Sequence, residues 1–158
     1  MEKCIVLFRR DLRIVDNTAL TRARLDGKHI IPVFIFTPEQ VYNNKFKSSN
    51  SIQFMVNSLL DLNEQINNIH SNAGLFAMYG DNIDILDQLY DKYKYTSLYL
   101  NCDYTPYSEK RDNNIHKFCK KRKIVFNSFH DILLLDTQDI VSGNDTHYKV
   151  FGQFYKKT

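Results

Sequence analysis

The sequence predicts an α/β fold with three layers, in which a five-stranded parallel sheet lies between two layers of helices. Two observations support this prediction: short apolar runs recur along the chain, and segments with helical periodicity separate them. This alternation is typical of parallel sheets, because each crossover between parallel strands places a helix against the sheet. The length of 158 residues suits one domain with a substantial core.

The predicted strands are rich in Ile, Val, Phe and Tyr, which favour extended backbone. They cover residues 3–8, 29–36, 75–79, 97–101 and 124–129. The first two runs are almost continuously apolar, which indicates burial on both faces of the sheet. Pro32 cannot donate a ladder hydrogen bond, but it lies early in the second run and the strand is retained.

The longest predicted helix covers residues 50–70, where Asn50 and Gln53 suggest a capping box. Its apolar residues recur at helical spacing and predict one buried stripe. The stripe consists of Ile52, Met55, Val56, Leu59, Leu60, Ile66 and Ile69.

Further helices are expected behind residues that suit the N-cap position. A short helix follows Asn17, and residues 37–41 begin with Thr-Pro and include a glutamine that completes a capping box. Two longer helices cover 81–94 and the segment from Thr105 to about residue 122.

Composition excludes several classes of protein. No apolar run approaches the ~20 residues of a membrane span, and the N-terminus does not resemble a signal peptide, so we expect a cytoplasmic or nuclear protein without membrane association. Cys4, Cys102 and Cys119 are far apart and are expected to be reduced thiols. The histidines show no metal-binding spacing, and no metal site is predicted.

Polar side chains gather mainly in three loops that follow predicted strands, at 9–17, 37–50 and 101–112, and the first and last of these carry the charged groups. Parallel sheets bind ligands at the carboxyl ends of their strands, near the point where strand order reverses. Acid, base and aromatic groups meet there, which suits a flat, conjugated, partly polar ligand. The alternative is that Arg10–Asp11 and Arg111–Asp112 are ion pairs that only pin the loops.

Signatures of several enzyme classes are missing. The sequence contains no GxGxxG, no P-loop and no GxSxG, and neither charged loop contains a histidine that could act as a base. The carboxyl edge of the sheet is therefore expected to bind a ligand rather than to catalyse a reaction, and no catalytic residue is predicted.

The stretch FRRDLRIVDNTAL at 8–20 resembles the opening signature of the DNA photolyase and cryptochrome family. Further stretches follow in the same order as in that family, and together they cover essentially the whole chain. They are residues 36–41, 44–62, 101–112 and 148–157.

This resemblance implies the Rossmann-like N-terminal domain of the family, which carries a light-harvesting antenna chromophore: a deazaflavin, FMN or FAD, or a methenyl-folate. It divides the chain into an antenna domain at 1–135 and a tail at 136–158. A helical domain with the catalytic FAD would begin soon after residue 158 and is absent from this chain. Deoxyribodipyrimidine photo-lyase activity would therefore require a separate FAD-domain chain, and contact with DNA would be indirect.

Resemblance also implies which residues would hold the chromophore. Deazaflavin-type sites of the family match Arg10, Asp11, Phe36 and Asp103, and folate-type sites match Glu109. Asn44 stands where folate binders have a histidine, which leaves the identity of the chromophore open. Arg13, Asp16 and Asn17 match positions that hold the first loop in place.

A different class of function stays open: a non-catalytic remnant or stand-alone binding module. In that case Phe151, Phe154 and Tyr155 would form an exposed docking face for a partner or for homo-oligomerisation. A nucleotide-binding protein of the stress-protein type would need a glycine-rich phosphate loop, which the sequence lacks.

Overall fold

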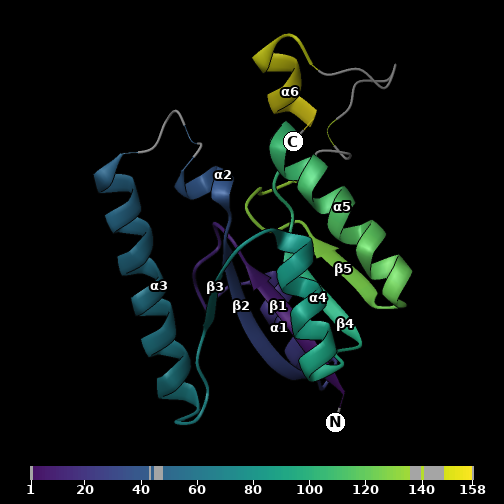
Figure 1. The fold of residues 1–158 in the computed structure, drawn as a ribbon. Helices are drawn as coiled ribbons and strands as arrows, with labels where there is room; N and C mark the ends of the chain where they lie inside the picture. Colours follow the sequence, from purple (N-terminus) through teal and green to yellow (C-terminus); the bar gives the residue numbers. More distant parts are fainter. Residues whose placement is uncertain (1, 43, 45–47, 136–139, 141–147, 158) are drawn as a thin grey trace.

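The computed structural model describes residues 2–42, 44, 48–135, 140 and 148–157 (Figure 1). Its sheet has five parallel strands in the order β3-β2-β1-β4-β5, which confirms the predicted sheet. The strands are β1 (Lys3–Phe8), β2 (His29–Phe36), β3 (Phe76–Tyr79), β4 (Ser97–Asn101) and β5 (Val125–Phe129). The predicted strand boundaries agree with these to within one residue.

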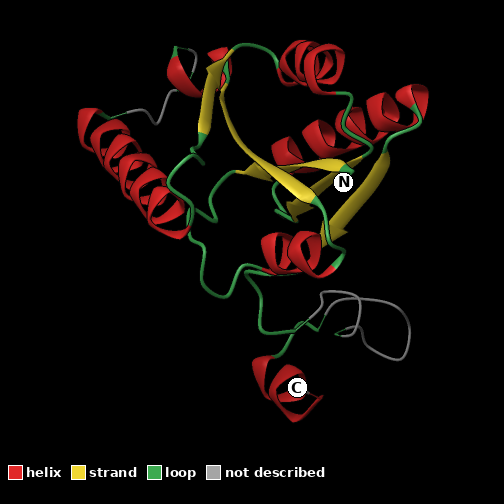
Figure 2. Cartoon of the chain, turned by 90° about the horizontal axis from the view of Figure 1, so that it is seen from below, coloured by secondary structure: helices red, strands yellow, loops and turns green. Residues whose placement is uncertain are grey.

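Helices cover both faces of the sheet, as Figure 2 shows. α1 and α3 pack on one face, and α4 and α5 pack on the other. The helices are α1 (Thr18–Leu25), α2 (Pro38–Val41), α3 (Ser49–Ile69), α4 (Asn82–Tyr93), α5 (Pro106–Arg122) and α6 (Phe151–Lys157). The predicted caps Asn17, Thr37, Asp81 and Thr105 are all confirmed.

Alternation along β1 divides the core between the two helix layers. Ile5 and Leu7 pack with α4 and α5, whereas Val6 and Phe8 pack with α1 and α3. Each of these side chains is at most 2% exposed, so β1 is buried on both faces as predicted. Pro32 lies opposite Val6 within the ladder of β1 and β2.

Two details of α3 were wrongly predicted. Its capping box is formed by Ser48 and Ser51 rather than by Asn50 and Gln53, because Ser51 Oγ accepts a hydrogen bond from the Ser48 N–H at 3.1 Å. The helix therefore begins one residue earlier than predicted.

The buried stripe of α3 is also narrower than predicted. Leu59 and Leu62 are buried, whereas Leu60 is 63% exposed and Ile69 is 71% exposed. At 100° per residue Leu62 falls on the same face as Leu59, and Leu60 is turned to the flank. Val56, from the same predicted stripe, is also exposed.

All three cysteines are free thiols, as expected. Cys4 and Cys119 are buried, and burial raises the pKa of each thiol to about 12. Both therefore behave as small apolar core residues.

Strand order reverses between β1 and β4. From β1 the chain adds β2 and β3 on one side, and it then returns to place β4 and β5 on the other. The loops that follow β1 and β4 consequently lie side by side at the carboxyl edge, where the rule for parallel sheets locates a ligand.

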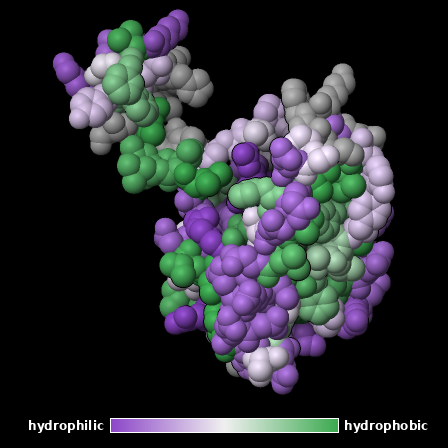
Figure 3. Space-filling view, turned by 90° about the vertical axis from the view of Figure 1, so that its left-hand side faces the viewer, coloured by the Kyte–Doolittle hydropathy of each residue, from purple (hydrophilic) through white to green (hydrophobic). Residues whose placement is uncertain are grey.

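α6 lies away from the main body. Residues 136–139, 141–147 and 158 lie outside the described residues, so much of the predicted tail is not described. Figure 3 shows α6 standing apart from the main body, with hydrophobic side chains between the two. Among the described residues, no helix combines the length and apolarity that crossing a membrane requires.

Candidate functional site

The loop after β1 is organised around the buried carboxylate of Asp11, which is 8% exposed. It accepts hydrogen bonds from the Arg9 N–H at 2.8 Å, from Asn17 Nδ2 at 3.3 Å and from Asn101 Nδ2 at 2.6 Å. Asn17 also caps α1 by accepting from the Leu20 N–H at 3.0 Å. Asp11 therefore points into the protein and ties β1, α1 and β4 together.

A second carboxylate, Asp131, holds the other end of this loop. Arg13 Nη2 donates to Asp131 at 2.7 Å and to the Asp16 carbonyl at 2.6 Å, while Thr18 donates to Asp131 through its N–H and its hydroxyl. Burial opposes ionisation of Asp131, but the bonds from Thr18 and Arg13 outweigh it and hold its pKa below the ordinary value. This geometry agrees with the holding role expected for Arg13, Asp16 and Asn17, whereas Asp131 was not predicted.

The ion pairs of the two loops differ in part from the predicted alternative, in which Arg10 pairs with Asp11 and Arg111 pairs with Asp112. Arg111 Nε does donate to Asp112, at 3.0 Å, but Asp112 also accepts from Arg9. Arg10 does not pair with Asp11. Its Nη1 lies 3.8 Å from Oδ2 of Asp103. Burial, followed by the charge of Arg111, lowers the pKa of Arg9. Arg9 and Arg111 are thus two buried cations that share one carboxylate.

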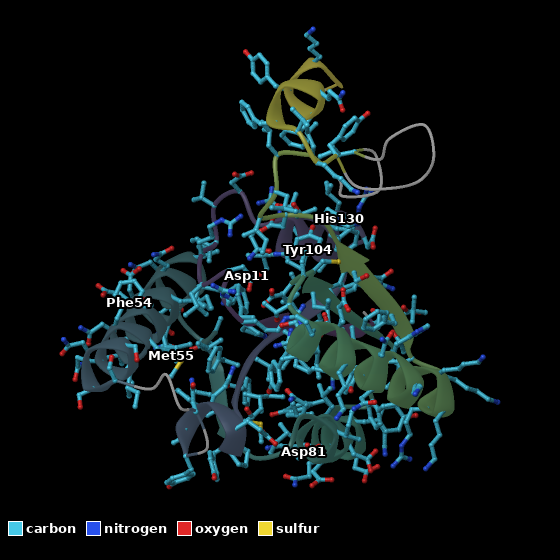
Figure 4. The ribbon with its side chains drawn as sticks, turned by 90° about the horizontal axis from the view of Figure 1, so that it is seen from above. Asp11, Phe54, Met55, Asp81, Tyr104 and His130 are labelled. Atoms are coloured by element: carbon cyan, nitrogen blue, oxygen red, sulfur yellow. The ribbon has the colours of Figure 1, made fainter. Side chains whose placement is uncertain are left out.

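A cavity of about 550 Å³ opens beside these loops. Its walls come from the loops after β1 and β4, from β2, and from α2, α3 and α5. Figure 4 views the molecule from the carboxyl edge of the sheet. There, Met55 projects from the side of α3 that faces the sheet. Its lining includes Arg10, Phe34, Asn44, Met55, Asp103, Tyr107 and Arg111.

Asp103 supplies a carboxylate to this cavity. It accepts hydrogen bonds from Ser108 Oγ at 2.9 Å and from the Thr105 N–H at 3.4 Å. Burial raises the pKa of Asp103, but these hydrogen bonds and the charges of Arg10 and Arg111 outweigh that effect and lower it. The carboxylate is therefore ionised at neutral pH and available to accept from a ligand.

The structure separates the predicted chromophore-binding residues into two groups. Arg10, Asn44 and Asp103 line the cavity. Asp11 is turned away from it, and Phe36 does not line it, although its ring centroid is 4.8 Å from that of the lining residue Phe34. Glu109 is exposed in the first turn of α5 and does not line the cavity.

Other lining residues were not predicted as ligand contacts. Phe34 was assigned only to a strand and Met55 only to a buried helix face. Tyr107 and Arg111 belong to the 101–112 segment, where neither was assigned a contact with a ligand, yet their spacing of four places both side chains on one side of α5. That spacing, behind the confirmed cap Thr105, is the signal that would have identified them.

This lining suits the binding of a small organic molecule. It combines apolar and aromatic walls with an ion pair and several hydrogen-bonding groups. Within the described ranges, no three His, Cys, Asp or Glu side chains are grouped as a metal ion requires.

Comparison with known proteins identifies the family. The family model described as DNA photolyase matches residues 4–158. The deoxyribodipyrimidine photo-lyase of Buchnera aphidicola from Acyrthosiphon pisum is 31% identical over 99% of this chain and 33% of that protein. Cryptochrome-2 of Arabidopsis thaliana is 31% identical over 99% of this chain and 25% of that protein.

Solved structures give the same result. The archaeal photolyase of Sulfolobus tokodaii, described as containing two FAD molecules, matches with a TM-score of 0.84 and 35% identity over 99% of this chain and 34% of that one. The chain thus spans about a third of the length of these photolyases. It belongs to the DNA photolyase family and has the fold of that family's N-terminal domain.

Proposed function

We propose that this chain binds a light-absorbing antenna chromophore in the cavity at the carboxyl edge of its sheet. The supporting observation is the position and lining of that cavity: it lies where strand order reverses, with Phe34, Met55 and Tyr107 available to contact a flat ring. Its volume of about 550 Å³ is within the range of small-molecule sites. The ion pair of Arg10 and Asp103 can donate to and accept from the ring edges.

Among the possible chromophores, a flavin or deazaflavin agrees better with the cavity than a methenyl-folate does. Glu109, the carboxylate expected for a folate, lies outside the cavity. Asn44 does line it, at the position where a folate-type site would have histidine. The relative from Sulfolobus tokodaii is described as containing two FAD molecules, with the implication of a novel light-harvesting cofactor, which supports the same choice.

Titration of the purified chain tests this proposal. Riboflavin, 5-deazariboflavin and methenyl-tetrahydrofolate would be added separately while ligand fluorescence and absorbance are followed. We expect saturable binding of the first two compounds, and competition between them because they share one cavity. Tighter binding of the folate would reassign the chromophore, and the absence of binding by all three would overturn the proposal.

We also propose that the bound chromophore passes its excitation to a catalytic FAD held by a helical domain, which would carry out repair of pyrimidine dimers and contact DNA. The role of this chain would be to bind and orient the chromophore. Exposed apolar side chains support docking of such a domain: Leu134 is 99% exposed, Phe151 74% and Tyr155 70%.

The same exposed surface supports the second candidate, a stand-alone module that self-associates. Sedimentation of the chain, alone and mixed with the helical FAD domain of a photolyase relative, distinguishes the two. A monomer that binds the FAD domain is the expected result. A stable dimer that ignores the FAD domain would favour the second candidate.

A further inference from the structure

A second compartment adjoins the main cavity on the side of α4. It has a volume of about 400 Å³ and shares Glu39, Tyr107 and Arg111 with the main cavity. Figure 4 labels Asp81, at the start of α4, where this compartment lies. The residues that line this compartment alone are Asp81, Asn82, Ile83, Lys110 and Asn114.

Arg111 stands at the junction and carries an unused donor. Its side chain is 10% exposed, and its Nε donates to Asp112 at 3.0 Å. Its Nη2 is buried and has no hydrogen-bond partner among the described residues. The Tyr107 ring lies beside the guanidinium, with 5.8 Å between Cζ and the ring centroid. A buried N–H without an acceptor is costly, so a ligand oxygen that reaches Nη2 would satisfy this donor.

The remaining groups of the compartment define the chemistry of such a ligand. Lys110 and Arg111 are cations, whereas Glu39 and Asp81 are carboxylates, and Asp81 already accepts from the Ile83 N–H at 2.7 Å. A phosphate dianion would face both carboxylates, and an apolar group would leave the polar lining unpaired. Hydroxyl groups both donate and accept, so they match a lining that contains carboxylates, cations and the amides of Asn82 and Asn114.

We propose that this second compartment binds the polyhydroxylated side arm of the chromophore, with Arg111 Nη2 donating to one of the arm's oxygens. The inference rests on the proposed function, since it requires the ring to occupy the main cavity. It makes Arg111 a residue that selects chromophores by their arm rather than by their ring.

A pair of flavins that share one ring system tests the arm separately. Riboflavin carries a ribityl arm, whereas lumiflavin has a methyl group at the same ring nitrogen. We expect riboflavin to bind about tenfold more tightly than lumiflavin, as one recovered hydrogen bond to a charged donor would provide. Affinities would be measured by fluorescence quenching, with FMN as a third ligand.

Two variants test the residues that carry the inference. Arg111→Met should reduce the ratio between the affinities for riboflavin and lumiflavin to near one. Asn114→Trp should do the same by filling the compartment from an exposed position on α5. Arg122→Met serves as the control, because Arg122 is on the same helix, pairs with Asp87 and lines neither compartment. If Arg111→Met does not fold, as judged by its thermal unfolding, Asn114→Trp decides alone.

The outcomes separate this inference from the proposed function. Equal binding of riboflavin and lumiflavin would overturn the inference and leave the proposed function intact. FMN binding more than tenfold more tightly than riboflavin would also overturn it, in favour of a phosphate site. If no flavin binds, the inference falls together with the flavin assignment on which it rests.

Discussion

Asn101, at the end of β4, donates a hydrogen bond of 2.6 Å to the carboxylate of Asp11 in the loop after β1. Both side chains are buried, and the bond crosses the point where strand order reverses. Asn101 also donates to Asn17 at 3.0 Å and accepts from the Ala19 N–H at 3.0 Å. The charged motif after β1 is thus held by a polar network within the core, and this network positions Arg10 at the cavity.

Replacing Asp11 tests this network. Asp11→Ala removes the acceptor of Asn101, Asn17 and the Arg9 N–H and leaves buried donors unpaired. We expect the free energy of unfolding to fall by about 2–4 kcal/mol, measured by urea denaturation. Asp16→Asn is the control, since Asp16 is exposed in the same loop with φ of 53°, which asparagine tolerates. A loss below about 0.5 kcal/mol for Asp11→Ala would contradict the role of the network.

The placement of two carboxylates near α5 gives a prediction for binding. Asp103→Asn should weaken flavin or deazaflavin binding by about tenfold, because an ionised acceptor in the cavity is replaced by a neutral one. Glu109→Gln should leave the affinity unchanged, since Glu109 lies outside the cavity. Fluorescence titration of both variants measures the difference. A larger effect of Glu109→Gln would indicate a ligand bound in a different position.

The corrected start of α3 can be checked by a pair of alanine substitutions. Ser48→Ala removes the side-chain oxygen that accepts from the Ser51 N–H at 3.1 Å and should lower the free energy of unfolding by about 1 kcal/mol. Asn50→Ala should have no destabilising effect, because the Asn50 side chain is not the cap and alanine favours a helix. Thermal and urea unfolding of both variants measure this. The reverse order of effects would restore the cap predicted from sequence.

Asp131 predicts a dependence of stability on pH. Its pKa is lower in the folded protein than in the unfolded chain, so its contribution is present at neutral pH and is lost as pH falls through the folded pKa. At pH 7 the free energy of unfolding of the wild type should exceed that of Asp131→Asn by about 1–3 kcal/mol, and this difference should shrink below about pH 4. Urea denaturation at several pH values tests this, with the exposed Asp91→Asn as the control. A difference in the free energy of unfolding that grows as pH falls would contradict this role of Asp131.

Local sequence patterns predicted most of the fold. The strands are recognised because apolar β-branched and aromatic residues cluster in short runs, and four helices are recognised by Asn17, Thr37, Asp81 and Thr105 at their starts. α3 was predicted less accurately, because several serine and asparagine residues there can each act as a cap. Its apolar residues also outnumber those that a single face can bury, so periodicity did not exclude Leu60 and Ile69.

The sequence by itself determined the α/β class, the family resemblance and the two loops that form the candidate site. Only the tertiary structure decided which side chains of the loop after β1 face the cavity. Arg10 and Asp11 are neighbours in the chain, yet Arg10 lines the cavity while Asp11 turns inward, because the donors of Asn17 and Asn101 converge on that carboxylate. The unused donor of Arg111 depends equally on long-range packing, since Asp112 is shared with Arg9, 103 residues earlier in the chain. Side-chain direction in a loop is set by partners from distant segments, and spacing within the loop carries no information about them.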